Sequence, residues 1–270
     1  MRQLDLSQLA ERQSGPDPDG AEPANRRRLD CRVAGVSEPR LVLVHGFGTS
    51  AHLWRRVRAG LAAEPLTPDL MGFGDAAALG QLGQTTGDMA EQLAGILKAA
   101  GGGPFKVVGH SMGGKVVLLL AARFPSLVSE LLLVAPSPST PEPMTEEGRA
   151  ELRSAHGDSA ALDAQQKHIT LERLAEPDRQ QFIKDGQRAS RDAWQAWPDV
   201  GSREDVSGEI SGLTLPIQVL FSEDDPAIDA DTIRSQVLAN LPQARATAVR
   251  GCGHLMPLEA PQHILAALNG

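Results

Sequence analysis

Phe-Lys-Val-Val-Gly-His-Ser-Met-Gly, residues 105–113, joins a short apolar run to a longer apolar stretch. The short run predicts a buried strand over 105–108, and the longer stretch predicts a helix over 111–124. Glycine stands two residues before and two residues after Ser111, because larger side chains would collide in a tight strand-to-helix turn. Such a turn directs the serine hydroxyl out of the sheet, at a helix N-terminus that stabilises developing negative charge. The stretch therefore predicts an α/β fold in which Ser111 is a candidate nucleophile.

Strand and helix patterns alternate along the rest of the chain. Strands that alternate with helices of this length form βαβ units, so we expect a mostly parallel sheet with helices on both faces. Chemistry in such sheets gathers at the carboxyl ends of the strands. Further strands are predicted at 41–44, near 66, at 128–134, 217–221 and 246–250, and further helices at 53–62, 86–100, 232–240 and 257–268.

Two segments depart from this alternation. Residues 13–25 are too polar to bury enough apolar surface to fold alone, which predicts a flexible arm at the N-terminus. Residues 136–143 are rich in proline, and the polar helical sequence after them contains no strand-like run, which predicts an inserted helical cap. The predicted boundaries are 1–28 for the arm, 29–135 and 213–270 for the core, and 136–212 for the cap.

Composition and charge argue against several classes of partner. The 270 residues carry a formal net charge of −8, and the basic run Arg26–Arg28 is too short to bind nucleic acid against that charge. The chain has no tyrosine, so no tyrosine can act as a catalytic acid. The sequence shows no signal-like N-terminal stretch and no apolar run near the ~18–20 residues of a membrane span. We therefore expect a cytoplasmic protein that contacts no membrane. Cys31 and Cys252 form no metal-type pair and are interpreted as lone thiols, with a disulfide left open.

Residues 109–115 also fit most of a phosphate-binding loop, Gly-x-x-x-x-Gly-Lys. The next residue is Val116, where magnesium binding needs serine or threonine. The missing hydroxyl and the acidic net charge disfavour this alternative. Lys115 is therefore interpreted as a residue on the surface of the helix.

A nucleophilic serine needs a base, and the base needs an acid that orients it. His254 is the predicted base, because it lies in Gly-Cys-Gly-His between the last strand and the last helix. The run Ser-Glu-Asp-Asp-Pro, 222–226, supplies three carboxylates after the strand at 217–221. Only one of them can point at the imidazole, and the other two are expected to be solvated. His45 and His110 sit in glycine motifs and are expected to make structural hydrogen bonds. The remaining histidines carry no such signature: His52, His156, His168 and His263.

Acyl transfer also needs donors that stabilise an oxyanion. The backbone N–H of Met112 directly follows the candidate nucleophile. A second donor is expected from the loop His45–Gly48, where glycines allow close approach of the backbone, and the N–H of Phe47 is the choice.

Taken together, these motifs resemble the α/β-hydrolase superfamily. The segments that match it in order are 43–48, 68–74, 109–113, 222–226 and 253–254. The resemblance implies Asp225 as the acid of a Ser111–Asp225–His254 triad, with Asp224 second. Ser222 departs from the family, which commonly has glycine there, and so does the run Ala-Ala-Ala-Leu-Gly at 76–80.

The resemblance implies a serine hydrolase that uses no cofactor or metal and cleaves a carboxylic ester of a small molecule through an acyl-enzyme. The same triad leaves several alternatives open: cleavage of carbon–carbon bonds in ring-cleavage products, thioesterase or amidase activity, and peracid formation. A non-catalytic small-molecule-binding protein of this fold is the alternative from another class. Trp194 and Trp197 could line the pocket or belong to the core of the cap. The pocket candidates are His45, Gly46, His110, Trp194, Trp197 and Leu255.

Overall fold

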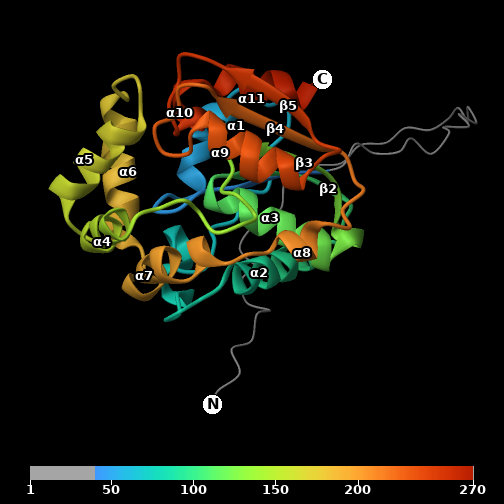
Figure 1. The fold of residues 1–270 in the computed structure, drawn as a ribbon, viewed down its shortest axis with the longest axis horizontal. Coiled ribbons are helices and arrows are strands. Elements are labelled where there is room, and N and C mark those ends of the chain that lie inside the picture. The colour runs from blue at the N-terminus through green and yellow to red at the C-terminus, as the bar shows by residue number, and fades with distance from the viewer. Residues whose placement is uncertain (1–39, 270) are drawn as a thin grey trace, which may run out of the picture. The chain divides into compact units, whose positions relative to one another are not determined.

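The computed structural model describes residues 40–269, so the predicted arm and Cys31 lie outside the described residues. Five parallel strands form one sheet in the order β1-β2-β3-β4-β5 (Figure 1). The parallel arrangement agrees with the sequence-based prediction of a mostly parallel sheet. The predicted strand near Leu66 is reduced to a single residue that pairs in parallel with Val42. The strands are β1 (Arg40–Val44), β2 (Phe105–His110), β3 (Val128–Val134), β4 (Ile217–Ser222) and β5 (Arg245–Val249).

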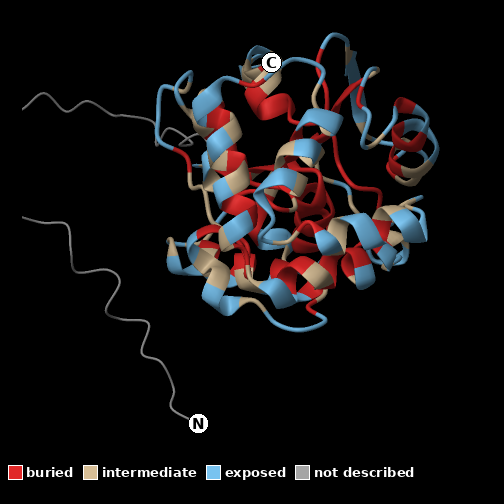
Figure 2. Cartoon of the chain, turned by 90° about the vertical axis from the view of Figure 1, so that its left-hand side faces the viewer, coloured by how far each residue is buried: buried red, intermediate tan, exposed pale blue. Residues whose placement is uncertain are grey.

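Helices cover both faces of the sheet, and the residues buried between these layers form the core (Figure 2). Successive strand residues point to opposite faces, so Val107 and Leu131 join one hydrophobic cluster while Val108 and Leu132 join the other. The first cluster includes residues of α2 (Thr86–Ala99), α3 (Met112–Arg123) and α8 (Ser207–Ile210). The second includes residues of α1 (Arg55–Arg58), α10 (Met256–Glu259) and α11 (Pro261–Asn269).

Three predicted helices are broken in the structure. The last one divides into α10 and α11 because Pro261 cannot continue a helix and holds Ala260 outside the helical region, at φ −140° and ψ 53°. The predicted helix at 53–62 is a 3-10 turn followed by the short α1. The helix predicted at 232–240 consists of α9, one π-helical stretch and one 3-10 turn. The bounds of these pieces are Ala51–Trp54, Ala230–Thr232, Ile233–Val237 and Leu238–Asn240.

Between β3 and β4 the described chain forms helices and no strand, and α4, α5 and α6 gather on the left in Figure 1. We call residues 136–212 the cap segment and propose that it covers the site described below. Its last helix, α8, packs against the core helix α3, so the cap segment ends on the core. The other helices of the cap segment are α4 (Glu146–Ser154), α5 (Ser159–Ile169), α6 (Glu176–Arg188) and α7 (Arg191–Asp199).

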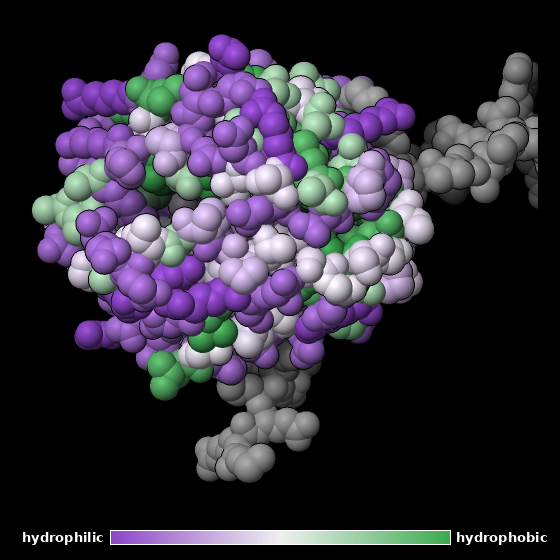
Figure 3. Space-filling model, viewed as in Figure 1, coloured by the Kyte–Doolittle hydropathy of each residue, from purple (hydrophilic) through white to green (hydrophobic). Residues whose placement is uncertain are grey.

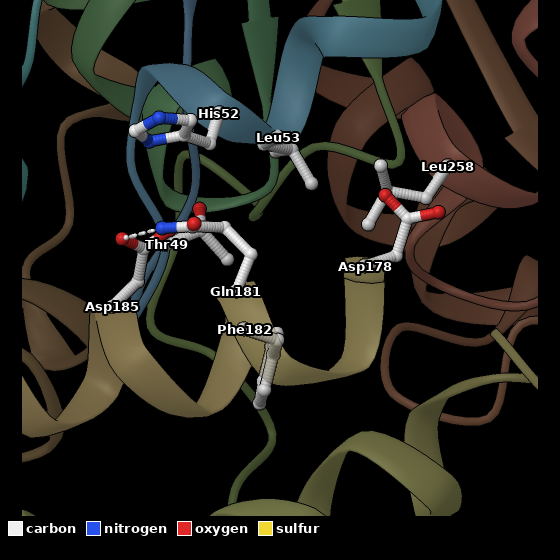
Figure 4. A pocket seen from close by; sticks show the side chains of 8 residues that line it. All are labelled: Thr49, His52, Leu53, Asp178, Gln181, Phe182, Asp185 and Leu258. Atoms are coloured by element: carbon white, nitrogen blue, oxygen red, sulfur yellow. Dashed lines mark hydrogen bonds between the residues drawn. The ribbon is translucent and has the colours of Figure 1, made fainter. Parts of the chain in front are cut away.

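Helix α6 is docked on the core by polar contacts around a cavity of about 10 Å³ (Figure 4). The buried Asp178 forms ion pairs with the guanidinium groups of Arg55 and Arg56. One turn along the helix from Gln181, the carboxylate of Asp185 accepts from Gln181 Nε2 (2.9 Å) and from Ser50 Oγ (2.7 Å). These contacts hold the cap segment against the residues that follow β1.

Lys115 is buried, so its interpretation as a surface residue was wrong. Its ammonium group donates to the backbone oxygens of Glu204 (2.6 Å), Gly201 (3.1 Å) and Thr140 (3.4 Å). Thr140 lies near the start of the cap segment, and the other two lie near its end. A single side chain of α3 therefore fastens both ends of the cap segment to the core.

Lys115→Met is expected to destabilise the protein by about 1–3 kcal/mol, because methionine fills the space but leaves buried carbonyl groups without their donor. The measurement is chemical unfolding. Lys167→Met is the matched control, since the Lys167 side chain is 66% exposed and pairs with Asp163 on the same helix. This control is expected to change stability by less than about 0.5 kcal/mol. Equal stability of the two variants would contradict a fastening role for Lys115.

The surface in view is mostly hydrophilic, with hydrophobic side chains in small separate groups (Figure 3). No helix among residues 40–269 is both long enough and apolar enough to cross a membrane. The same part of the chain holds no group of three His, Cys, Asp or Glu residues suited to a metal ion.

Candidate active site

Ser111 stands where β2 passes into α3. Its backbone has φ 52° and ψ −123°, a conformation that costs a non-glycine residue roughly 1–3 kcal/mol. The Ser111 N–H donates to Val134 O at 3.1 Å. Ser111 O accepts from the N–H groups of Gly114 (2.8 Å) and Ser137 (3.0 Å). The cap segment, through Ser137, thus helps to hold the strained turn that carries the hydroxyl.

Gly113 is required by close packing of α3 on the end of β1. A Cβ atom there would lie 2.4 Å from His45 O and 2.8 Å from Val44 O, both of which are backbone atoms. Gly113→Ala is therefore expected to destabilise the protein by at least about 2 kcal/mol. Gly95→Ala is the matched helical control. A Cβ there meets nothing within 4 Å, so this variant should gain about 0.5–1 kcal/mol. Chemical unfolding of both variants tests this, and equal effects would contradict it.

His254 connects Ser111 to Asp225. Its Nε2 lies 2.9 Å from Ser111 Oγ, and its Nδ1 lies 2.8 Å from Asp225 Oδ2. The other oxygen of Asp225 accepts from the backbone N–H groups of Ala227 (2.8 Å) and Ile228 (3.1 Å), which fixes the carboxylate. All three side chains are nearly buried, and they come from loops at the carboxyl ends of β2, β4 and β5.

Of the other two carboxylates of the 222–226 loop, Asp224 is exposed, as expected, whereas Glu223 is half-buried, and both of them also contact protein groups. Asp224 Oδ2 accepts from the Gly251 N–H at 2.8 Å, and Glu223 forms an ion pair with Arg234. The hydroxyl of Ser222 donates to Cys252 O at 2.5 Å. The serine that stands where the family commonly has glycine therefore ties this loop to the loop that carries His254.

The charges of His254 and Asp225 are coupled. Burial lowers the pKa of His254, but the Asp225 charge and hydrogen bond, together with the nearby Glu142, outweigh it and leave this pKa raised. Burial raises the pKa of Asp225, yet His254 and the N–H groups of Ala227 and Ile228 bring it below its ordinary value. An ionised Asp225 beside a neutral His254 fixes the imidazole proton on Nδ1 and leaves Nε2 free to accept one.

If His254 is the base, the rate should depend on pH in a defined direction. Only neutral His254 can accept a proton, so kcat/KM is expected to fall as pH drops through its pKa. Because that pKa is raised from 6.5, the acid limb should lie above the ordinary histidine value. Asp225→Asn should move the limb to lower pH. The measurement is a pH–rate profile, and a wild-type limb below the ordinary histidine value would contradict the assignment.

The backbone of the His45–Gly48 loop is held so that one peptide N–H is left available. Gly46 O accepts from His45 Nδ1 (2.8 Å) and Thr49 Oγ1 (2.9 Å). A trans peptide directs its C=O and the following N–H to opposite sides, so the Phe47 N–H points away from these donors. Neither this N–H nor that of Met112 has a hydrogen-bond acceptor within residues 40–269. Both are suited to receive an oxyanion.

His45 and His110 make the structural hydrogen bonds expected of them. His45 Nε2 accepts from the Leu70 N–H at 3.0 Å, and burial lowers its pKa. His110 Nε2 lies 2.8 Å from His254 O and donates to it, since a carbonyl can only accept. Burial and the neighbouring His254 lower the pKa of His110 to about 3, so it is neutral.

Ser111 and His254 open into a cavity of about 130 Å³. Of the pocket candidates, Trp197 and Leu255 line it together with His110, and the oxyanion candidate Phe47 lines it too. His45, Gly46 and Trp194 are not among its lining residues. Trp194 is fully buried and donates from Nε1 to Leu152 O (2.6 Å), so it belongs to the core of the cap segment.

Several lining residues were missed because the cap segment gives no sequence signal for which side chains point inward. Ala227 and Ile228 could have been found, since they directly follow the predicted acid. The missed residues are Glu142, Met144, Leu152, Gln165, Ile169, Phe182, Ala227 and Ile228.

Comparisons with known proteins agree with this architecture. The model of the "Alpha/beta hydrolase family" matches residues 41–268. An esterase of Mycobacterium tuberculosis is 37% identical over 148 residues, which cover 54% of this chain and 49% of that protein, so the chain spans about half the length of this relative. A 2-hydroxy-6-oxononadienedioate/2-hydroxy-6-oxononatrienedioate hydrolase of Burkholderia vietnamiensis is 23% identical over 86% of each chain. The solved structure of an esterase from Exiguobacterium antarcticum superposes with a TM-score of 0.75, at 18% identity, over 86% of this chain and 92% of the other.

Proposed function

The chain belongs to the alpha/beta hydrolase family, and on this premise we propose that it is a serine hydrolase that cleaves carboxylic esters of small molecules. The observation that carries the proposal is the continuous hydrogen-bonded path from Ser111 Oγ through His254 to Asp225. The similarity to the esterase of Mycobacterium tuberculosis supports the same activity. A cavity of about 130 Å³ suits a small substrate. The cytoplasmic location stays a prediction.

In the proposed mechanism Ser111 Oγ attacks the ester carbonyl carbon while its proton passes to His254 Nε2. Asp225 holds the Nδ1 proton and stabilises the imidazolium that forms. The carbonyl oxygen becomes an oxyanion that accepts hydrogen bonds from the N–H groups of Phe47 and Met112. His254 then protonates the leaving alcohol as the ester C–O bond breaks. Water, deprotonated by His254, attacks the acyl-enzyme, and the acid and free Ser111 are released.

Carbon–carbon bond hydrolysis is the second candidate activity, because the same triad can serve it. A relative from Burkholderia vietnamiensis, named as a hydrolase of 2-hydroxy-6-oxononadienedioate and 2-hydroxy-6-oxononatrienedioate, is the similarity that favours it. The test is a panel of nitrophenyl esters, thioesters and a vinylogous diketone, assayed with the wild-type protein and with Ser111→Ala. Ester hydrolysis that depends on Ser111 and exceeds diketone cleavage is expected. Diketone cleavage without activity on any ester would overturn the proposal. Inactivity on every substrate would favour the non-catalytic binding protein.

A further inference from the structure

Glu142 brings a carboxylate from the proline-rich start of the cap segment to the cavity that holds Ser111 and His254. Its backbone is fixed: the N–H donates to Ser202 O (2.8 Å), and its carbonyl accepts from the Met144 N–H (2.7 Å). Proline precedes and follows it, and each proline ring restricts φ. A rigid segment therefore presents this carboxylate to whatever occupies the cavity.

Two further cavities adjoin the one at Ser111, and Met144 and Ala227 line all three. The cavity at Ser111 is continued by one of about 210 Å³, which Glu142 also lines together with Asp229. A third cavity, of about 510 Å³, lies between α4 and α5 and is mostly apolar, with Glu151 as its carboxylate. No lysine or arginine from residues 40–269 lines any of the three. A bound molecule therefore meets apolar walls and negative charge.

The basic side chains nearest to Glu142 are committed elsewhere. Lys115 donates to three backbone oxygens, and Arg149 donates to Pro198 O (2.6 Å) and to the backbone oxygen of Glu142 (3.3 Å). No ion pair with the carboxylate of Glu142 is formed within the described part of the chain. Burial raises the pKa of Glu142 in spite of the opposing effects of the Ser137 hydroxyl and the Lys115 charge. A cationic group of a substrate would relieve this unfavourable burial.

We infer that Glu142 determines specificity, and that the preferred substrates are esters with an apolar chain and an ammonium group near the reacting carbonyl. This inference rests on the proposed esterase activity and names its substrate class. The apolar chain fits the cavity between α4 and α5, and the ammonium group is attracted to the Glu142 carboxylate. An anionic ester meets repulsion with no compensating cation. Discrimination of about tenfold or more is expected from one such partly desolvated charge contact.

The test uses esters of one acid whose alcohol groups carry a positive, a neutral or a negative end group. Trimethylammonioethyl, 3,3-dimethylbutyl and carboxyethyl esters of one medium-length acid place a cation, its neutral isostere and an anion on the alcohol side. A second series places the same groups on the acyl side. The wild-type kcat/KM should fall in the order cation, neutral, anion in at least one series. Glu142→Gln should reduce the cation-to-anion ratio about tenfold or more.

Two further variants complete the experiment. Glu142→Lys should reverse the order of cation and anion, and Glu147→Gln, at an exposed position of α4 that lines none of these cavities, should leave all ratios unchanged. Thermal unfolding verifies that each variant is folded. Unchanged ratios in Glu142→Gln, with hydrolysis that still needs Ser111, would overturn the specificity inference alone. Absence of any hydrolysis that needs Ser111 in the wild-type protein would overturn the esterase proposal together with it.

Discussion

Ser111→Ala is expected to reduce kcat/KM for ester hydrolysis by about 10⁴-fold or more, because the variant has no oxygen to form the acyl-enzyme. The folded state should be retained. Alanine is as disfavoured as serine at φ 52°, and the hydrogen bonds that hold the turn come from the backbone. The measurement is steady-state kinetics on the ester that the wild-type protein hydrolyses fastest, with thermal unfolding of both proteins.

Ser139→Ala is the matched control for Ser111→Ala. Ser139 is also a buried serine, and its hydroxyl has no hydrogen-bond partner within residues 40–269. Its loss should change kcat/KM by less than about threefold. If the Ser111 variant kept more than a few per cent of the wild-type rate, the hydroxyl could not be the nucleophile.

Asp225→Asn is expected to lower kcat by about 10⁴-fold, which is the effect known for the equivalent change in a serine protease triad. The cause can be traced in the structure. The Asn side-chain oxygen would accept from Ala227 and Ile228, as Oδ1 of Asp225 does, so its NH₂ group would face His254 Nδ1. His254 would then carry its proton on Nε2, where it cannot accept the proton of Ser111.

Asp224→Asn tests which of the two neighbouring aspartates, Asp224 or Asp225, is the acid of the triad. Asp224 accepts one hydrogen bond, from the Gly251 N–H, and an Asn oxygen can accept it equally well. This variant is expected to keep kcat within about fivefold of the wild type. Kinetics of both variants on one ester test the assignment, and a larger loss in Asp224→Asn than in Asp225→Asn would reverse the choice of acid.

The positions of Ser111 and His254 could be predicted because each stands in a glycine motif between a predicted strand and a predicted helix. Parallel strands bring their carboxyl ends to one edge, so residues far apart in sequence meet there. The choice among Glu223, Asp224 and Asp225 depends on how one turn orients three adjacent carboxylates. No pattern in the residues encodes that orientation, and the choice came from the family resemblance.

The sequence predicts little of what depends on contacts between distant loops. Lys115 lies on a helix whose pattern does not reveal that both ends of the cap segment pass over it. Glu142 sits in a proline-rich run without periodicity, so nothing in the run indicates that it lines the cavity at Ser111. The breaks in the predicted helices could not be read from the sequence either, except at Pro261, where the proline itself marks the break.

The central claim is that Ser111 is a nucleophile activated by His254. A fluorophosphonate probe tests it most directly, because attack by an activated serine forms a stable phosphonyl ester and releases fluoride. At neutral pH the intact wild-type protein should gain the mass of one phosphonyl group, and peptide mass spectrometry should locate it on Ser111. The Ser111→Ala protein should gain none. A wild-type protein that stays unlabelled, or that carries the label on another residue, would contradict the account.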